Sequence, residues 1–229
     1  MGDHAPDGAG EDGALSDPAA LERGRRLFAG ECRFFHASQR ASDLPARGAP
    51  EIAFAGRSNV GKSSLLNALT GRNALARVSK EPGRTQQLNF FALGPDVEGR
   101  KLVLVDMPGY GFARVSKSLL GQWSALIKQY LRGRAGLARV LVLVDSRHGL
   151  KPNDRELFDL LDETAVSWQV VLTKTDQLDP PALRSRIAEI AREVRKHPAG
   201  HPEILPTSAE RGDGIAELRA ALASLAAFG

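Results

Sequence analysis

Residues 56–63, GRSNVGKS, have the residue types and spacing of a loop that binds phosphate groups. The segment fits the pattern GxxxxGK[ST] and lies between a run typical of a β-strand and a run typical of a helix, which makes this pattern specific. Gly56 and Gly61 allow the backbone to curl, so that successive N–H groups point at a phosphate near the positive end of the following helix. We expect Lys62 to reach the β- and γ-phosphates of a nucleotide and the Ser63 hydroxyl to ligate Mg²⁺. The other loop residues expected at the nucleotide are Arg57, Ser58, Asn59, Val60 and Ser64.

Two further segments could complete the magnesium and γ-phosphate site. A strand-like run ends at Asp106, whose carboxylate could hold the magnesium through water, and the N–H of Gly109 could face the γ-phosphate. Thr85 lies in a polar loop of residues 71–86 and is suited to be a second hydroxyl ligand of Mg²⁺. We therefore expect Ser63, Thr85 and Asp106 at the metal. The neighbours of these residues that we expect at the nucleotide are Gly83, Arg84, Gln86, Gln87, Met107 and Pro108.

The base of the nucleotide is indicated by two segments near the C-terminal half of the chain. Thr173, Lys174, Thr175 and Asp176 end the fifth predicted strand, and Thr207, Ser208 and Ala209 end the sixth, where α/β sheets bind ligands. A carboxylate at Asp176 can accept from both N1–H and the exocyclic amine of guanine, and adenine offers it no such pair. The stem of Lys174 can cover the base, and the Ala209 N–H can bond the guanine oxygen. The ordered set of motifs therefore predicts GTP and GDP as ligands.

The elements that must position these motifs alternate between short aliphatic runs and longer segments of helical period, the pattern of a layered α/β domain. Six strands are predicted at residues 51–56, 87–93, 101–106, 138–145, 169–174 and 203–207. The second and third are separated by a turn too short for a crossover helix, so they must pair antiparallel. About five helices are predicted at residues 63–70, 119–131, 152–163, 180–196 and 213–225. We therefore expect a three-layer α/β/α fold of the P-loop NTPase type, with a six-stranded, mostly parallel sheet containing one antiparallel strand. Trp123 and Trp168 are expected in its core.

Charge is distributed unevenly along the 229 residues. The net charge is +4, but residues 1–20 carry five carboxylates and no Lys or Arg, so the remainder carries +9. The first twenty residues are small, acidic and rich in Gly and Pro, and we expect them to be a disordered tail. Residues 21–229 are then one nucleotide-binding domain. Its densest positive stretch, residues 70–134, coincides with the loops expected to sense the γ-phosphate, and such a field can attract a polyanion.

The composition also indicates in which cellular compartment the protein works and which classes of protein are excluded. The single Cys32 cannot form an intramolecular disulfide, and no Cys and His spacing suits a structural zinc site. The longest aliphatic run, residues 140–144, is far shorter than the roughly 20 residues that cross a bilayer. No secretory signal opens the chain. A cytoplasmic protein without a membrane span is expected.

With these motifs in order, the chain resembles the TRAFAC-class translation-factor-like GTPases, and closely the EngB (YihA/YsxC) ribosome-biogenesis GTPases of bacteria. The segments that carry the resemblance are GRSNVGKSSLLNAL, GRTQQLNFF, DMPGYG, TKTD and TSA, and it runs from about residue 22 to the C-terminus. It implies Mg²⁺-dependent GTP binding and hydrolysis, a role in assembling the large ribosomal subunit, and a requirement in cell division and septation. A monomer is expected, in contact with ribosomal RNA and ribosomal proteins.

Two positions depart from the commonest GTPase pattern. Thr173 stands where many GTPases have Asn and can make fewer hydrogen bonds, so moderate guanine affinity is expected. Tyr110 stands where Ras-like enzymes carry the glutamine that orients the attacking water. Asn59 resembles the asparagine that coordinates K⁺ in cation-activated relatives. We therefore expect slow intrinsic hydrolysis, raised by K⁺ or a ribosomal partner, with Lys62, Asn59, Thr85 and Gly109 as the residues that act in it.

Basic residues near the γ-phosphate suggest how the nucleotide could control RNA binding, and two alternative functions remain open. Arg57, Arg84, Arg114 and Lys117 lie in or beside the γ-phosphate-sensing loops, so the nucleotide state could gate a basic surface against ribosomal RNA. The first rival is a P-loop kinase or ATPase. Such a protein would lack the base-reading TKTD motif, so only the phosphate loop supports this alternative. A nucleotide-gated binding module in cell division with negligible turnover remains open because of Tyr110.

Overall fold

The computed structural model describes residues 17–72, 75, 87–95, 99–110 and 117–226, with the backbone alone described for residues 117–124. Its sheet has seven strands in the order β1-β3-β4-β2-β5-β6-β7. Their bounds are β1 Cys32–Ser38, β2 Glu51–Gly56, β3 Leu88–Leu93, β4 Leu102–Asp106, β5 Leu137–Asp145, β6 Trp168–Thr173 and β7 Leu205–Pro206. Strand β3 runs antiparallel to both of its neighbours, β1 and β4, and the remaining pairs are parallel.

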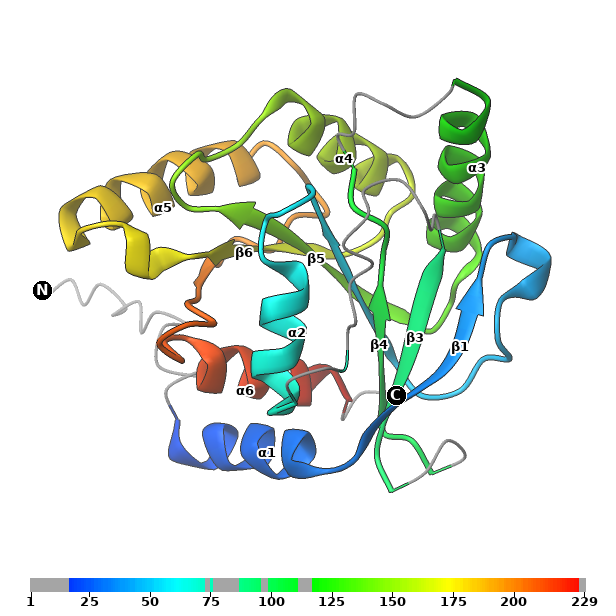
Figure 1. Cartoon of the computed structure of the whole chain (residues 1–229). Helices are drawn as coiled ribbons and strands as arrows, with labels where there is room; N and C mark the ends of the chain where they lie inside the picture. Colours follow the sequence, from blue (N-terminus) through cyan, green and yellow to red (C-terminus); the bar gives the residue numbers. More distant parts are fainter. Residues whose placement is uncertain (1–16, 73–74, 76–86, 96–98, 111–116, 227–229) are drawn as a thin grey trace, which may run out of the picture.

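Six α-helices cover the two faces of this sheet (Figure 1). They are α1 Pro18–Ala29, α2 Lys62–Thr70, α3 Lys117–Gly133, α4 Pro152–Glu163, α5 Pro180–Val194 and α6 Ile215–Ala226. Helices α1, α2 and α6 bury their apolar residues against one face of the sheet, and α3, α4 and α5 bury theirs against the other. The expected three-layer α/β/α arrangement is therefore confirmed.

The central strands are buried on both faces, as crossover helices require. All six residues of β2 are buried, and so are all six of β6. Trp168, which begins β6, is fully buried and stacks on Phe158 with 4.1 Å between ring centroids. The prediction that Trp168 belongs to the core is confirmed, and the side chain of Trp123 lies outside the described residues.

One strand was missed by the sequence prediction, which gave six. Strand β1 lies at the edge of the sheet, where Arg33 and Phe34 are exposed, so its sequence CRFFHAS shows no clean alternation of buried and exposed residues. The expected antiparallel strand is β3. The sixth predicted strand, residues 203–207, is reduced to the two residues of β7.

The N-terminal boundary also differs from the prediction. Helix α1 begins at Pro18, and the carboxylate of Asp17 caps it by accepting from the N–H groups of Ala19 and Ala20. The helix therefore begins before the predicted end of the acidic tail at residue 20, and residues 1–16 lie outside the described part. Helix α1 packs closely on α6: a Cβ at Gly24 would lie 2.6 Å from the backbone nitrogen of Ala220. Within the described residues, no helix combines the length and the apolar character needed to cross a membrane.

Candidate functional site

The segment 56–63 forms a loop between the end of β2 and the start of α2, as its sequence predicts. Asn59 has a φ of 63° and Gly61 a φ of 107°, both in the left-handed region, and these two residues turn the chain back toward the helix. Gly61 is the N-cap of α2, and no side chain caps the first turn. The unpaired N–H groups of that turn are the donors an anion needs, and the helix dipole adds to their attraction.

The loop is fixed by close contacts with the segment that follows β4. The Tyr110 N–H donates to the Gly56 carbonyl at 3.3 Å, and the Ser58 N–H donates to the Tyr110 carbonyl at 3.4 Å. A Cβ at Gly109 would lie 2.9 Å from the Ser58 hydroxyl oxygen and 3.3 Å from the Ser58 backbone nitrogen, so the close approach of the two segments favours glycine there. That hydroxyl is buried without a hydrogen-bond partner in the described part of the chain. The two phosphate-side motifs of the sequence therefore lie against each other.

The side chains expected to hold magnesium lie beside this junction. Lys62 Nζ donates to Asp106 Oδ1, and both side chains are largely buried. Ser63 is half-buried in the first turn of α2. A serine hydroxyl and a carboxylate are oxygen ligands of the kind Mg²⁺ prefers, so Ser63 and Asp106 fit the ion. The third expected ligand, Thr85, lies outside the described residues, as do Gly83, Arg84 and Gln86.

Two other residues of the phosphate-side motifs lie away from the loop. Met107 is 3% exposed and packs in the core on the side of α3. Gln87 donates to Asn89 Oδ1 and accepts from Gln39 at the edge of the sheet. The structure therefore does not bring the side chains of Met107 and Gln87 to the phosphate loop.

The end of β6 is tied directly to the phosphate loop. The Thr173 hydroxyl donates to the Val60 carbonyl at 2.6 Å, so this threonine holds the loop in place. The next residue, Lys174, has a φ of 57° and extends its ammonium group to the Asn59 carbonyl at 2.7 Å and to Asp145 Oδ2 at 2.8 Å. Thr173 and Lys174 thus connect two motifs that are more than a hundred residues apart.

Asp176 is held at the rim of the same site. One carboxylate oxygen accepts from the Ser208 hydroxyl at 2.6 Å, and the other accepts from the Gln177 amide at 2.6 Å. The hydrogen bond from Ser208, followed by that from Gln177, lowers the pKa of Asp176. Asp176 is therefore an oriented carboxylate. The N–H of Ala209 donates to no acceptor in the described part of the chain.

A cavity of about 530 Å³ brings these segments together. Three of the predicted motifs contribute to its walls: the phosphate loop with the start of α2, the segment after β6, and the segment after β7. The lining residues are Gly61, Ser64, Leu65, Arg147, Thr173, Lys174, Asp176, Gln177, Thr207, Ala209 and Glu210.

Asp145 and Arg147 belong to the site, and the motif search missed both. The Asp145 carboxylate accepts from Lys174, from the Arg147 guanidinium at 2.7 and 2.9 Å, and from the Arg147 N–H at 3.1 Å. Burial alone would raise the pKa of Asp145, but the hydrogen bonds from Arg147 and Lys174 hold it well below its usual range. The position of Asp145 in the sequence could have indicated it, because Asp145 is the last residue of a predicted strand, as Asp106 is. Both residues therefore lie at the carboxyl ends of the parallel strands, where α/β sheets bind ligands.

Tyr110 points away from the phosphate loop, toward α4. Its hydroxyl donates to Asp154 Oδ1 at 2.8 Å, and the other oxygen of Asp154 accepts from the Lys151 N–H at 2.7 Å. Burial, and then the charge of Asp154, raises the pKa of Tyr110 well above its usual value. The Tyr110 hydroxyl is thus occupied in a structural contact with the first turn of α4.

Comparison with known proteins gives matches over most of the chain. Residues 51–174 match the family model described as 50S ribosome-binding GTPase, and residues 125–227 match that of the elongation factor Tu GTP binding domain. The chain is 55% identical over 212 residues to "Probable GTP-binding protein EngB" of Granulibacter bethesdensis, covering 93% of both chains. It is 57% identical over 210 residues to the protein of the same name from Bradyrhizobium diazoefficiens, covering 91% of this chain and 95% of that relative.

Two solved structures illustrate the likeness in fold. A crystal structure of a probable GTP-binding protein engB is 26% identical, with a TM-score of 0.59, and the match covers 78% of this chain and 100% of that one. The structure of Era in complex with MgGDPNP and part of 16S ribosomal RNA is also 26% identical, with a TM-score of 0.58. That match covers 76% of this chain and 56% of Era.

Proposed function

This chain belongs to the EngB family of GTP-binding proteins, and on that premise we propose that it is a GTP-hydrolysing switch in assembly of the large ribosomal subunit. The matched family model is described as a 50S ribosome-binding GTPase, which supports the ribosomal role. We further propose that the protein works in the cytoplasm as a monomer, with the large-subunit RNA and proteins as its partners.

The observation that carries guanine binding is the oriented carboxylate of Asp176 at the rim of the cavity. Its two oxygens lie in a plane fixed by Ser208 and Gln177, and a base that offers two adjacent N–H donors, as guanine does, matches a carboxylate. A base without that pair would leave the carboxylate partly unsatisfied, which is a strong ground for rejection. The stem of Lys174 covers one face of the base, Ala209 donates to the guanine oxygen, and Thr175 and Thr207 support the two strand ends.

The phosphate groups lie on the free N–H groups of the loop 56–63. Lys62 neutralises the β- and γ-phosphates, and Ser63 and Asp106 hold Mg²⁺, with Thr85 as the further ligand. The bound ion supplies positive charge against the phosphate oxygens. One structural relative, Era, was solved with MgGDPNP, which supports the same ligand class here.

Hydrolysis is proposed to be slow in the isolated protein. The Tyr110 hydroxyl donates to Asp154, so it does not orient a water at the γ-phosphate. Lys62, Thr85 and Gly109 position the phosphate, and Asn59, whose carbonyl is held by Lys174, is the proposed contact for K⁺. A potassium ion or a ribosomal partner would then add positive charge at the γ-phosphate.

Gating is proposed to act through the basic residues near the γ-phosphate. Arg57 is half-buried within the phosphate loop, whereas Arg84 and Arg114 lie outside the described residues and the side chain of Lys117 is not described. If GTP orders these segments, the basic surface they form is presented to RNA in one nucleotide state. A role in cell division and septation would follow from the supply of ribosomes.

The second candidate is a nucleotide-gated binding module in cell division with negligible turnover. The occupied Tyr110 hydroxyl favours it, because the residue that stands where Ras-like enzymes carry the catalytic glutamine is engaged with Asp154. Single-turnover GTP hydrolysis, with and without large ribosomal subunits and in potassium or sodium buffer, separates the two functions. The switch predicts turnover that subunits or potassium accelerate, and equal, negligible rates under all four conditions would support the binding module.

A further inference from the structure

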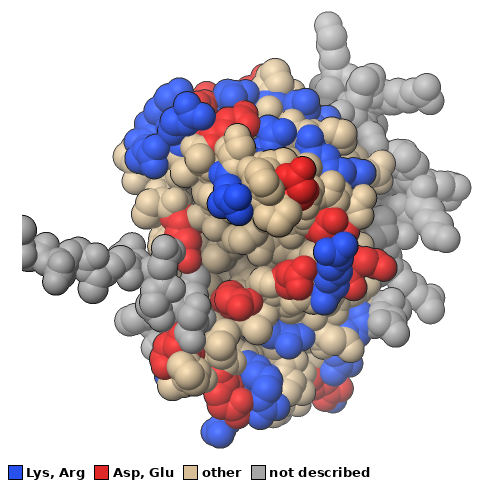
Figure 2. Space-filling view, turned by 90° about the vertical axis from the view of Figure 1, so that its left-hand side faces the viewer, with Lys and Arg blue, Asp and Glu red and all other residues tan. Residues whose placement is uncertain are grey.

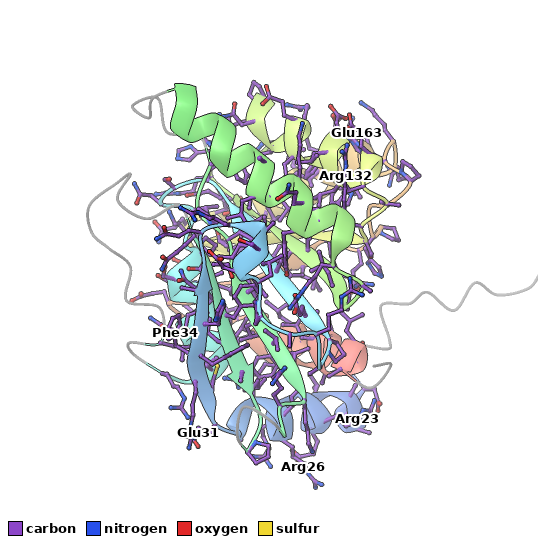
Figure 3. All side chains as sticks on the ribbon, turned by 90° about the vertical axis from the view of Figure 1, so that its right-hand side faces the viewer. Arg23, Arg26, Glu31, Phe34, Arg132 and Glu163 are labelled. Carbon is purple, nitrogen blue, oxygen red and sulfur yellow. The ribbon has the colours of Figure 1, made fainter. Side chains whose placement is uncertain are left out.

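The side of the molecule formed by α3 and by the β1–β2 connection carries a group of exposed basic side chains. They are Arg40 and Arg47 in the connection and Lys128 and Arg132 in α3, and we call this group the α3 face. Figure 3 looks onto this side, with α3 lying across it and Arg132 near the C-terminal end of the helix.

The four residues lie close together because the connection packs on the helix. Arg47 Nη2 donates to the Gly133 carbonyl at 2.8 Å, which places Arg47 at the end of α3 beside Arg132. Lys128 and Arg132 are four residues apart and therefore lie on one side of the helix, separated by about one turn. The short helix Ala41–Asp43, which follows Arg40, also packs on α3.

Carboxylates are scarce on this face. Helix α3 has 17 residues, three of them basic and none acidic, whereas α1, α4, α5 and α6 each contain at least one carboxylate. Asp43 is the one acidic residue in residues 39–50, and it accepts from the neighbouring Ser42 hydroxyl. Within the described part of the chain, none of the four cations forms an ion pair.

Many basic side chains elsewhere on the surface are neutralised. On α5 and α4, Glu193 pairs with both Arg155 and Lys196, and Glu189 pairs with Arg186. The side of the molecule shown in Figure 2 carries both basic and acidic side chains. On the α3 face the four cations have no ion-pair partner among the described residues, although Figure 3 shows one carboxylate, Glu163 at the end of α4, near Arg132 in that view.

We propose that the α3 face binds the phosphate backbone of large-subunit ribosomal RNA, and that it does so in both nucleotide states. The kind of partner rests on the proposed ribosomal function; the surface itself rests on the charges and contacts above. Long, exposed Lys and Arg side chains without ion-pair partners suit a phosphate backbone, which binds mainly by electrostatic attraction.

An acidic protein would fit this face less well. Stable protein interfaces have an apolar, aromatic-rich centre. Among the described residues the one large hydrophobic side chain that is exposed is Phe34, which lies on β1 and packs against Phe91. The α3 face therefore offers charge without such a centre.

The face is rigid, which is why it acts in both nucleotide states. Leu126, Ile127, Tyr130 and Leu131 anchor the same stretch of α3 in the core, each 3% exposed or less. The stretch of α3 that carries Lys128 and Arg132 is therefore held by the core, and we expect it to keep its position when the γ-phosphate is gained or lost. The α3 face therefore supplies affinity that does not depend on the bound nucleotide.

The test compares the double variant Lys128→Gln/Arg132→Gln with a matched control, Arg184→Gln/Arg195→Gln. Arg184 lies on α5 and Arg195 is the residue that caps its C-terminus; both are exposed and carry no ion pair in the described part of the chain. Helix α5 lies on the left of Figure 1 and α3 on the right. Binding to purified large ribosomal subunits and to protein-free large-subunit RNA is measured with GDP and with a non-hydrolysable GTP analogue, between about 50 and about 200 mM salt.

We expect the α3 variant to bind both probes about tenfold more weakly, with the slope of log K against log salt reduced by about 1.4 to 1.8. The loss should be the same in both nucleotide states, and the control should bind as the wild type does. Equal binding by variant and control would overturn the proposal, as would a loss on intact subunits that is absent on protein-free RNA, which would indicate a ribosomal protein. RNA binding that depends on Lys128 and Arg132 without any binding to subunits would support this inference and contradict the proposed function.

Discussion

The ammonium group of Lys174 lies 2.8 Å from the carboxylate of Asp145, and the same ammonium donates to the Asn59 carbonyl at 2.7 Å. One lysine thus joins the end of β5, the end of β6 and the phosphate loop. Because a flexible lysine stem loses conformational freedom when it is held, the Asp145 contact prepares Lys174 to cover a base before the nucleotide arrives.

Replacing Asp145 should therefore weaken nucleotide binding although Asp145 reads no part of the base. Asp145→Asn removes a charge-assisted hydrogen bond that is worth about 1.5 to 3 kcal/mol. Part of this free energy is lost from nucleotide binding, because Lys174 is then no longer held in the orientation that covers the base. We expect the GDP dissociation constant, measured by calorimetry, to rise about tenfold. Glu193→Gln is the control, since Glu193 also pairs with two cations but lies far from the cavity. An unchanged affinity in Asp145→Asn would remove Asp145 from the site.

Asp176→Asn should change which base is accepted. An amide presents one donor and one acceptor where the carboxylate presents two acceptors, so guanine loses one of its hydrogen bonds and faces a donor. We expect GDP affinity to fall by about 100-fold or more, and xanthosine diphosphate, which carries an oxygen in place of the amine, to bind better than GDP. Competition binding with the two nucleotides measures this, and a preserved preference for GDP would contradict the role of Asp176.

Tyr110→Phe tests whether Tyr110 is a structural contact. Loss of the hydrogen bond to Asp154 should lower the free energy of unfolding by about 1 kcal/mol, because Asp154 keeps the Lys151 N–H as a donor. Urea denaturation measures the loss, and single-turnover GTP hydrolysis should stay unchanged. Tyr130→Phe is the matched control, since the Tyr130 hydroxyl also donates to a carboxylate, that of Glu51. Glu51 begins β2 and so lies at the end of the strand away from the phosphate loop. A selective fall in hydrolysis for Tyr110→Phe would show instead that its hydroxyl serves the reaction.

Charge reversal at Arg114 or Lys117 should weaken binding to large ribosomal subunits while leaving GDP affinity nearly unchanged. Both residues belong to the basic stretch that follows the γ-phosphate-sensing motif, and contacts of such residues to RNA depend on charge alone. Subunit binding and GDP binding are measured on the same variants. A parallel loss of GDP affinity would assign these residues to the nucleotide site.

Sequence predicted most of the fold and much of the candidate site, because both depend on local patterns. The strand 51–56 was predicted with its observed bounds, since its residues are buried on both faces and it is followed by the phosphate loop. The edge strand β1 was missed because exposure of Arg33 and Phe34 removes the pattern that burial creates. Asp145 was missed because its partner Lys174 lies 29 residues away, and no motif records which strand ends meet.

The central claim, a nucleotide-gated switch on the large ribosomal subunit, is tested most directly by co-sedimentation of the protein with purified large subunits. The measurement compares saturating GDP with a non-hydrolysable GTP analogue at one salt concentration. The account predicts a much larger bound fraction with the analogue, above a constant part supplied by the α3 face. Equal bound fractions in the two nucleotide states would contradict the switch.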